Sequence, residues 1–439
     1  MKRLLPACFC ALSLLPAARS ADAPPNVVLI VVDDLGYADL GIHGSKEIAT
    51  PNMDSLAHDG VRFTSGYVTA PLCAPSRAGF LTGRWQNHFG FEYNPEPGVA
   101  WGLPTTEKTI AERLKPLGYA TGIFGKWHQG ETPEFHPLKR GFDEFYGFLS
   151  AMHSYFKSDD GKWGKIYRGT EPVELDKYLT QAIADESVSF IDRHKEKPFF
   201  LYVAFNAPHI PGQVPEGYLA QIPEGITDPV RRTYLAMVRA LDDGVGSILA
   251  ALHKNELDKN TLVVFFSDNG GALLAGAAAN GACNAPLRGG KAELWEGGIR
   301  VPFFMRWTDH IPAGRVLDGP VISLDVLPSL LALAGAPADP TLDGVNILPW
   351  VEGKAPVPAD RKPFFWKFYG RIAVREGGLK MIRPDYEKNL ELYDLPRDIS
   401  ETKDIASDHP ERVSAMRAEY DEWEKLNPKP LDKTESSPK

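Results

Sequence analysis

The sequence is poor in cysteine and lacks any long run of basic or apolar residues. Its 439 residues include four cysteines, and 48 Lys and Arg against 57 Asp and Glu give a net charge of −9. This balance excludes the broad positive surface of a protein that coats nucleic acid or anionic lipid. An anionic ligand would therefore need a local positive pocket. No segment after residue 20 reaches the roughly 18 consecutive apolar residues that span a bilayer.

The first twenty residues have the pattern of a secretory signal. Lys2 and Arg3 precede an apolar stretch over residues 4–15, and small residues follow as far as Ser20. We therefore predict a signal peptide at residues 1–20 and a soluble protein exported to the periplasm or secreted, without a stable membrane anchor. Removal of the signal peptide leaves two cysteines, Cys73 and Cys283, which allow one disulfide but no disulfide framework.

Apolar runs alternate with helical patterns along the chain, as is typical of α/β proteins with a large, mostly parallel central sheet flanked by helices. The predicted strands are residues 26–32, 61–68, 120–124, 198–205, 261–267 and 299–306. The predicted helices are residues 51–58, 106–117, 176–194, 228–253 and 324–334.

The composition changes near residue 351, where a Pro-rich connector begins. Beyond it, residues 371–376 and 379–383 flank two glycines as a hairpin, and residues 410–426 predict a closing helix. We predict an α/β domain over residues 21–350 and a small α+β subdomain of antiparallel strands and a helix over residues 351–426. Residues 427–439 lack an apolar period and are predicted to be disordered.

Polar side chains follow four of the predicted strands, at the edge where open α/β sheets bind ligands. Asp33 and Asp34 follow residues 26–32, and Asp268 and Asn269 follow residues 261–267. These side chains offer only oxygen atoms, which suit Ca²⁺ or Mg²⁺ better than zinc. Carboxylates that converge without a cation would repel one another. A turn or helix cap is the ordinary alternative for each pair alone.

Cationic and imidazole groups would surround the same point. Lys126 and His128 follow the strand near residue 124, His209 follows residues 198–205, and Lys291 comes later in the chain. A site that combines these cationic and imidazole groups favours the binding of an oxyanion.

Cys73 lies in the segment APLCAPSRAGFLTGR. Pro75 predicts the first residue of a helix that runs to about Thr82, which puts Cys73 just before a helix N-terminus and Arg77 one turn on. The helix dipole there is expected to lower the pKa of the thiol. A thiolate nucleophile would leave the oxygen-rich site unexplained, so another nucleophile is possible.

These segments resemble the type I, formylglycine-dependent sulfatases. Residues 73–77 (CAPSR), continued by residues 81–84 (LTGR), resemble their first signature, and residues 118–122 (GYATG) with 125–128 (GKWH) resemble the second. Similarity also covers the opening NVVLIVVDDLGYADLG, the later SDNG and the closing ELYDLPRDISETKDIA. The resemblance implies an alkaline-phosphatase-like fold, with residues 21–350 as the catalytic domain, in the arylsulfatase and N-acetylgalactosamine-sulfatase branch.

The resemblance implies that a formylglycine-generating enzyme or an anaerobic sulfatase-maturing enzyme oxidises Cys73 to Cα-formylglycine. A hydroxyl of its hydrated aldehyde would attack the sulfur of a sulfate ester, and the expected substrate is a sulfated carbohydrate. Ca²⁺, rather than Mg²⁺, is the expected metal. The implied metal ligands are Asp33, Asp34, the modified Cys73, Asp268 and Asn269.

Further roles follow from the same resemblance. Arg77 would orient the diol, while Lys126 and Lys291 would contact the sulfate. His209 would protonate the departing alcohol, and His128 would deprotonate the second hydroxyl. We choose Lys291 over the nearby Arg288 because it precedes LWEGG.

An aromatic-rich insert over residues 141–168 contains Phe145, Tyr146, His153, Tyr155, Phe156 and Trp163. It is a candidate lining for a carbohydrate cleft with His153 in contact with substrate, although such stretches are more often plain packing.

Two other functions fit parts of the pattern. One is a phosphomonoester or phosphodiester hydrolase of the same superfamily, because phosphate and sulfate esters are similar tetrahedral oxyanions. The other is a non-catalytic protein that binds sulfated glycans, with a disulfide between Cys73 and Cys283.

Overall fold

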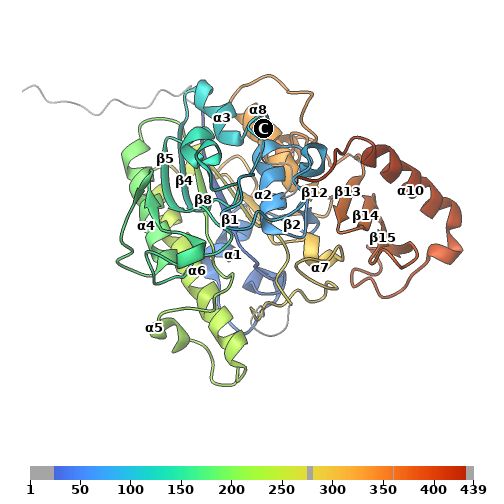
Figure 1. Ribbon diagram of the computed structural model, residues 1–439, viewed down its shortest axis with the longest axis horizontal. Coiled ribbons are helices and arrows are strands. Elements are labelled where there is room, and N and C mark those ends of the chain that lie inside the picture. Colours follow the sequence, from blue (N-terminus) through green and yellow to red (C-terminus); the bar gives the residue numbers. More distant parts are fainter. Residues whose placement is uncertain (1–23, 274–279, 359, 432–439) are drawn as a thin grey trace, which may run out of the picture.

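The computed structural model describes residues 24–273, 280–358 and 360–431. The predicted signal peptide, and the predicted tail beyond residue 431, lie outside the described residues. The chain builds a broad central sheet between helical layers, with a smaller sheet and a long helix beside it (Figure 1).

The central sheet has the strand order β11-β2-β10-β9-β1-β8-β4-β5-β6-β7. The strands β9, β1, β8, β4 and β5 pair in parallel, whereas β10, β6 and β7 run antiparallel to their neighbours. The strand bounds, in sheet order, are Arg315–Leu317, Val61–Phe63, Phe303–Arg306, Thr261–Ser267, Asn26–Val32, Phe199–Ala204, Ala120–Lys126, Glu144–Phe148, Tyr167–Arg168 and Glu171–Pro172.

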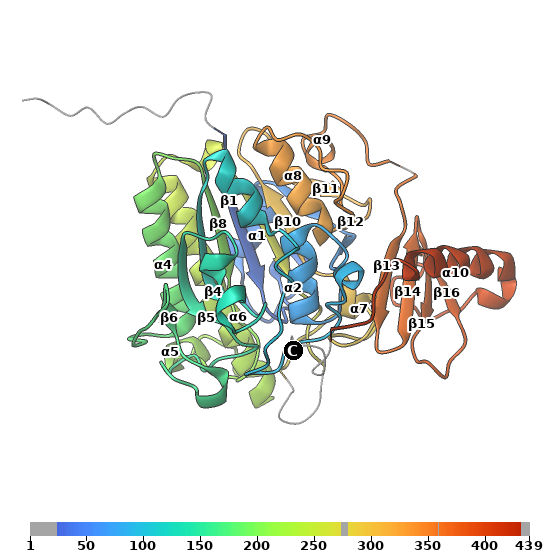
Figure 2. The same ribbon diagram turned by 45° about the horizontal axis from the view of Figure 1, so that its top comes forward.

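Helices cover both faces of this sheet, which is why its middle strands are continuous apolar runs. Alternate side chains of β1 point to opposite faces: Val28 and Ile30 pack with α1, α4 and α6, whereas Val27 and Leu29 pack with α2, α3 and α8. Figure 2 shows these helices around the sheet. The bounds of α1 to α9 are Pro51–His58, Cys73–Thr82, Ile110–Leu114, Leu179–His194, Glu216–Leu219, Pro229–Lys254, Glu296–Ile299, Val326–Leu333 and Leu348–Val351. The predicted α/β class is confirmed.

The C-terminal part contains a separate antiparallel sheet, in the order β13-β14-β15-β16. Its strands are Phe364–Phe368, Arg371–Glu376, Leu379–Arg383 and Glu391–Asp394, and α10 spans Pro410–Glu424. Residues of α10 share a buried core with this sheet. The predicted hairpin is confirmed with the same bounds, while a domain border at residue 351 stays a prediction.

Some predicted elements differ from the structure. The single strand at 61–68 is two strands: β2 joins the central sheet, and β3, Gly66–Tyr67, pairs with β12, Val321–Ile322. The strand at 299–306 begins only at Phe303, because Pro302 lacks the N–H that a ladder needs. The helix at 106–117 begins at Ile110, where Thr109 and Glu112 form a capping box.

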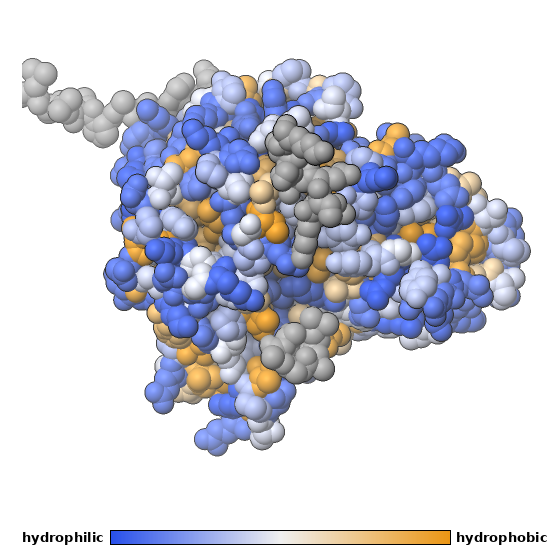
Figure 3. Space-filling model, in the orientation of Figure 1, coloured by the Kyte–Doolittle hydropathy of each residue, from blue (hydrophilic) through white to orange (hydrophobic). Residues whose placement is uncertain are grey.

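On the face shown in Figure 3, apolar residues are scattered among hydrophilic ones. Among the described residues, no helix combines the length and the apolar composition needed to cross a membrane.

Candidate active site

The polar residues that follow the middle strands meet at the carboxyl edge of the central sheet. Asp33 and Asp34 follow β1, and Asp268 and Asn269 follow the neighbouring β9, whose Ser267 pairs with Val32. Lys126 ends β4, and His209 lies in the loop after β8. Since these strands are parallel neighbours, their ends converge on one point.

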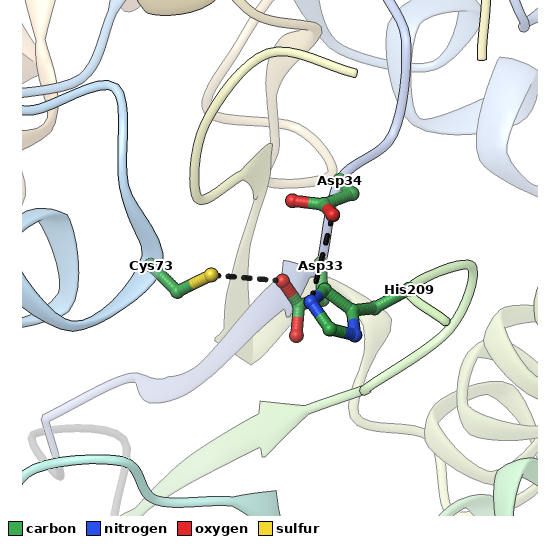
Figure 4. A group of neighbouring side chains, drawn as sticks. All are labelled: Asp33, Asp34, Cys73 and His209. Carbon is green, nitrogen blue, oxygen red and sulfur yellow. Dashed lines mark hydrogen bonds and ion pairs between the residues drawn. The ribbon is translucent and has the colours of Figure 1, made fainter. Parts of the chain in front are cut away.

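Four side chains form a tight buried cluster, the acidic cluster: Asp33, Asp34, Cys73 and His209 (Figure 4). Each offers one potential ligand atom, and these atoms all lie within 4.8 Å of one another. Cys73 enters from the start of α2, and its Sγ donates a hydrogen bond of 3.4 Å to Asp33 Oδ1. Cys73 is unpaired, and so is the partly exposed Cys283. The two do not form the disulfide that was considered as an alternative.

The helix that carries Cys73 begins two residues earlier than predicted, at Cys73 itself. The expected lowering of the thiol pKa is wrong. Burial and the negative charge of Asp33 raise the pKa of Cys73 to about 12. Burial and the nearby carboxylates therefore outweigh the neighbouring lysines, and the thiol stays protonated near neutral pH.

Lys291 reaches the cluster from the loop before α7. Its Nζ lies 2.7 Å from Asp34 Oδ1 and 3.2 Å from Cys73 Sγ. Asn284 holds this loop, because its Nδ2 donates to the carbonyl oxygens of Gly271 and Gly289. Arg288, by contrast, stacks over Trp295 at 3.6 Å and donates to the backbone of Glu401. Of these two basic residues, Lys291 is therefore the one that contacts the cluster.

Asp34 itself adopts a left-handed backbone conformation, with φ of 65°. Non-glycine residues rarely adopt it, and such strain gathers at functional sites. The turn aims the carboxylate at both Lys291 and Asn269, whose Nδ2 donates to Asp34 Oδ1 over 2.7 Å.

Arg77 and Lys126 form ion pairs with two buried carboxylates, Asp268 and the cluster member Asp33. Arg77 is fully buried, and its Nε and Nη2 lie 2.9 and 2.8 Å from Asp268 Oδ2. Lys126 Nζ lies 2.7 Å from Asp33 Oδ2. Burial opposes the charge of Asp33, but Lys126 and the other cations outweigh it and hold the pKa of Asp33 far below its usual range. Burial and the charge of Asp33 instead raise the pKa of Asp268 to about 7.

Two histidines of the site, His209 and His128, differ in their hydrogen bonding. His209 Nδ1 contacts the carbonyl oxygen of Ile210 at 2.6 Å, which leaves Nε2 facing Asp34 at 3.7 Å. His128 is buried, and neither of its ring nitrogens has a hydrogen-bond partner. Burial and the charge of Lys126 hold the pKa of His128 well below its usual value. Because unpaired buried polar atoms are costly, His128 is poised for a ligand.

The donor set fits a hard divalent cation. Asp33, Asp34 and Asp268 supply carboxylate oxygens, and Asn269 Oδ1 is buried without a hydrogen-bond partner. Asp268 lies at the border of the acidic cluster, where its Oδ1 accepts a 3.5 Å hydrogen bond from the backbone of Asp34. Such a cation would satisfy the orphaned oxygen of Asn269.

His153 is not a member of the acidic cluster. It is fully buried, its ring packs on Phe148, and its two nitrogens contact the carbonyl oxygens of Ser154 and Gly164. Phe145, Tyr146 and Tyr155 of the same insert are also buried, whereas Phe156 is half-exposed. Much of the insert is therefore packing, because β5 is a strand of the central sheet.

Sequence reasoning missed Tyr202, whose hydroxyl accepts a 3.0 Å hydrogen bond from Arg77 Nη1. The available signal was a polar atom inside an otherwise apolar strand. It also missed a buried ion network, the Glu296–Lys380–Glu401 network. Lys380 Nζ lies 3.0 Å from Glu296 Oε1 and 2.7 Å from Glu401 Oε1. This network ties the C-terminal sheet to the loop that bears Lys291.

Comparisons with known proteins agree with this geometry. The sulfatase family profile matches residues 25–336, and a profile described as N-sulphoglucosamine sulphohydrolase, C-terminal, matches residues 290–425. The chain is 37% identical over 408 residues to the N-acetylgalactosamine-6-sulfatase of Rattus norvegicus, covering 86% of this chain and 75% of that protein.

Solved structures agree as well. Ps i-CgsB, crystallised in complex with k-i-k-neocarrahexaose, has a TM-score of 0.88 and 39% identity, covering 93% of this chain and 94% of its own. The PsFucS1 sulfatase from Pseudoalteromonas sp. has a TM-score of 0.78 and 26% identity, covering 93% and 92%. The chain belongs to the sulfatase family and is a sulfuric ester hydrolase.

Proposed function

We propose that this sulfatase hydrolyses sulfate esters of carbohydrates, with Cys73 oxidised to Cα-formylglycine and a Ca²⁺ ion bound beside it. The observation that carries the proposal is the position of Cys73, buried between Asp33 and Lys291 at the start of α2. The names of two relatives support a carbohydrate: one is an N-acetylgalactosamine-6-sulfatase, and the other was crystallised with a neocarrahexaose.

The protonated state of Cys73 disfavours direct thiol catalysis. A thiol with a pKa of about 12 holds almost no thiolate near neutral pH, and the thiolate is the reactive form. Formylglycine would supply a hydrated aldehyde as the nucleophilic group, and a bound Ca²⁺ would supply Lewis-acid stabilisation of the sulfate oxygens. Asp33, Asp34, Asp268, Asn269 and the modified residue 73 would hold the ion.

Lys126 and Lys291 approach residue 73 from different elements, the end of β4 and the loop before α7. Their ammonium groups would stabilise negative charge on the sulfate in a site where burial strengthens electrostatic interactions. Arg77 would orient the diol of the modified residue 73. Its guanidinium group is held in place because it donates hydrogen bonds to Asp268 and to the hydroxyl of Tyr202.

His209 would give a proton to the departing alcohol, which is otherwise a poor leaving group. Its Nδ1 contact with Ile210 orients the ring so that Nε2 faces the cluster. His128, whose two ring nitrogens have no hydrogen-bond partner, would accept a proton from the second hydroxyl of the diol.

We also propose that residues 1–20 direct export to the periplasm or the medium, and that a formylglycine-generating or anaerobic sulfatase-maturing enzyme modifies Cys73. Residues 21–350 would form the catalytic domain and residues 351–426 its C-terminal subdomain.

The reaction is tested with paired sulfate and phosphate monoesters of one chromophore. We expect sulfate turnover to dominate, to vanish in Cys73→Ala, and to persist in the matched control Cys283→Ala. Dominant phosphate turnover, or full activity in Cys73→Ala, would refute the assignment.

The substrate is tested separately by measuring sulfate release from N-acetylgalactosamine 6-sulfate and from sulfated neocarra-oligosaccharides. Carbohydrate turnover that exceeds turnover of the chromogenic ester supports the proposal. An enzyme that cleaves aryl sulfates and none of a panel of sulfated sugars would contradict it.

A further inference from the structure

A cavity of about 320 Å³ lies apart from the acidic cluster, beside β12, β13 and β14. Figures 1 and 2 both place these strands where the C-terminal sheet meets the central part. The walls of the cavity come from the residues before β12, the connector after α9, and the C-terminal sheet. They include Pro320, Val357, Arg361, Lys362, Phe364 and Arg375.

Two arginines of this cavity carry donors without acceptors. Arg375 is 6% exposed, and its Nε and Nη1 have no hydrogen-bond partner. The side chain of Arg361 is 9% exposed, and its Nε and Nη1 are unpartnered as well. Buried donors of a charged group cost free energy unless an acceptor meets them. The two guanidinium groups at this wall are therefore incompletely hydrogen-bonded within the described chain, although the unpartnered nitrogen atoms themselves are buried.

The charge of the cavity favours an anion. Arg361 forms an ion pair with Asp325 through Nη2, which lies 2.5 Å from Oδ2. The guanidinium group of Arg375 stacks over the ring of Tyr67 at 4.7 Å. Lys362 adds an exposed ammonium, and no described carboxylate residue lines the cavity. Guanidinium groups suit oxyanions because their N–H groups form a planar fork.

The size and the remaining walls fit more than a bare ion. A volume of about 320 Å³ lies at the lower end of the range for small-molecule pockets, roughly 300–1,000 Å³. Pro320, Val357 and the ring of Phe364 supply apolar surface, against which a sugar ring can pack.

We propose that this cavity is a second binding site for a sulfate group, separate from the catalytic site. The group comes either from a sulfated sugar unit of a longer chain or from a free sulfate ion. The site goes beyond the proposed function, because binding here requires neither formylglycine nor turnover.

The test is calorimetric titration of the full-length Cys73→Ala protein with galactose 6-sulfate, inorganic sulfate and unsulfated galactose. We expect Arg375→Gln to weaken one binding event about tenfold or more, as for the loss of a charged hydrogen bond. Lys362→Gln should weaken the same event, and its exposed position spares folding. The control Arg397→Gln removes an equal charge from a side chain that is 86% exposed and outside the cavity.

The probes distinguish the two sources. Tighter binding of galactose 6-sulfate assigns the site to a sugar-borne sulfate, and equal binding of inorganic sulfate assigns it to the free ion. Identical titrations for Arg375→Gln, Lys362→Gln and Arg397→Gln would overturn the proposal, as would equal binding of unsulfated galactose. With Cys73 intact, Arg375→Gln should cleave a small chromogenic sulfate ester at the parent rate.

Discussion

Replacing Lys380 by Met should destabilise the protein strongly, and more so at alkaline pH. The side chains of Lys380, Glu296 and Glu401 are all completely buried, and the ammonium lies between the two carboxylates. Removing one partner of a buried ion pair typically costs about 3–5 kcal/mol, because a charge is left unpaired. Here the loss leaves two carboxylates facing each other.

The pH dependence follows from the pKa of Glu401. Burial and the charge of Glu296, opposed by Lys380, raise this pKa to about 7, against an ordinary value of 4.5. Without Lys380 the pKa of Glu401 rises further, so the folded variant binds a proton that the unfolded chain has released. The stability of the variant therefore falls as the pH rises, by at most about 1.4 kcal/mol per pH unit for one such proton.

The assay is urea unfolding followed by tryptophan fluorescence, at about pH 5.5 and about pH 8. Lys259→Met is the matched control, because Lys259 pairs with Asp309 on the surface and should have little effect. A variant Lys380→Met with the parent's free energy of unfolding, or with the same deficit at both pH values, would refute the reasoning.

Three further predictions concern the same structure. Glu401→Gln should flatten the pH dependence of the free energy of unfolding between about pH 4.5 and 7, because this window is where folded Glu401 retains its proton; an unchanged profile by urea titration would contradict this. Chelation should abolish turnover, and Ca²⁺ should restore it more fully than Mg²⁺; activity that survives exhaustive chelation would remove the metal from the account. Asn269→Ala should raise the Ca²⁺ concentration needed for half-maximal activity by about tenfold or more, as for a lost charge-assisted contact, with an unchanged requirement as the contrary result.

The middle of the fold could be predicted because its signals are local. The strands β1 and β9 were predicted to the residue, since both faces are buried and the apolar runs are continuous. β5, Glu144–Phe148, was not predicted because its residues lie in an aromatic-rich segment that was interpreted as the lining of a carbohydrate cleft. The division of residues 61–68 between two sheets depends on distant partners that no local pattern reveals.

The candidate site was predictable where it depended on strand ends and on motif spacing. The direction of the Cys73 pKa shift could not be predicted. The sequence indicates the start of the helix, but it does not indicate that the thiol is completely buried beside Asp33. The Glu296–Lys380–Glu401 network was equally hidden, because its members are separated by 84 and 105 residues along the chain. The burial of His153 depends on contacts with Phe148 and backbone carbonyls that only the fold creates.

The most direct test of the central claim is the mass of the tryptic peptide that ends at Arg77, measured on fully active protein. We expect that sulfur and two hydrogens at Cys73 have been exchanged for one oxygen, and that specific activity rises in proportion to the fraction of peptide changed in this way. Fully active protein in which this peptide retains its thiol would contradict the account.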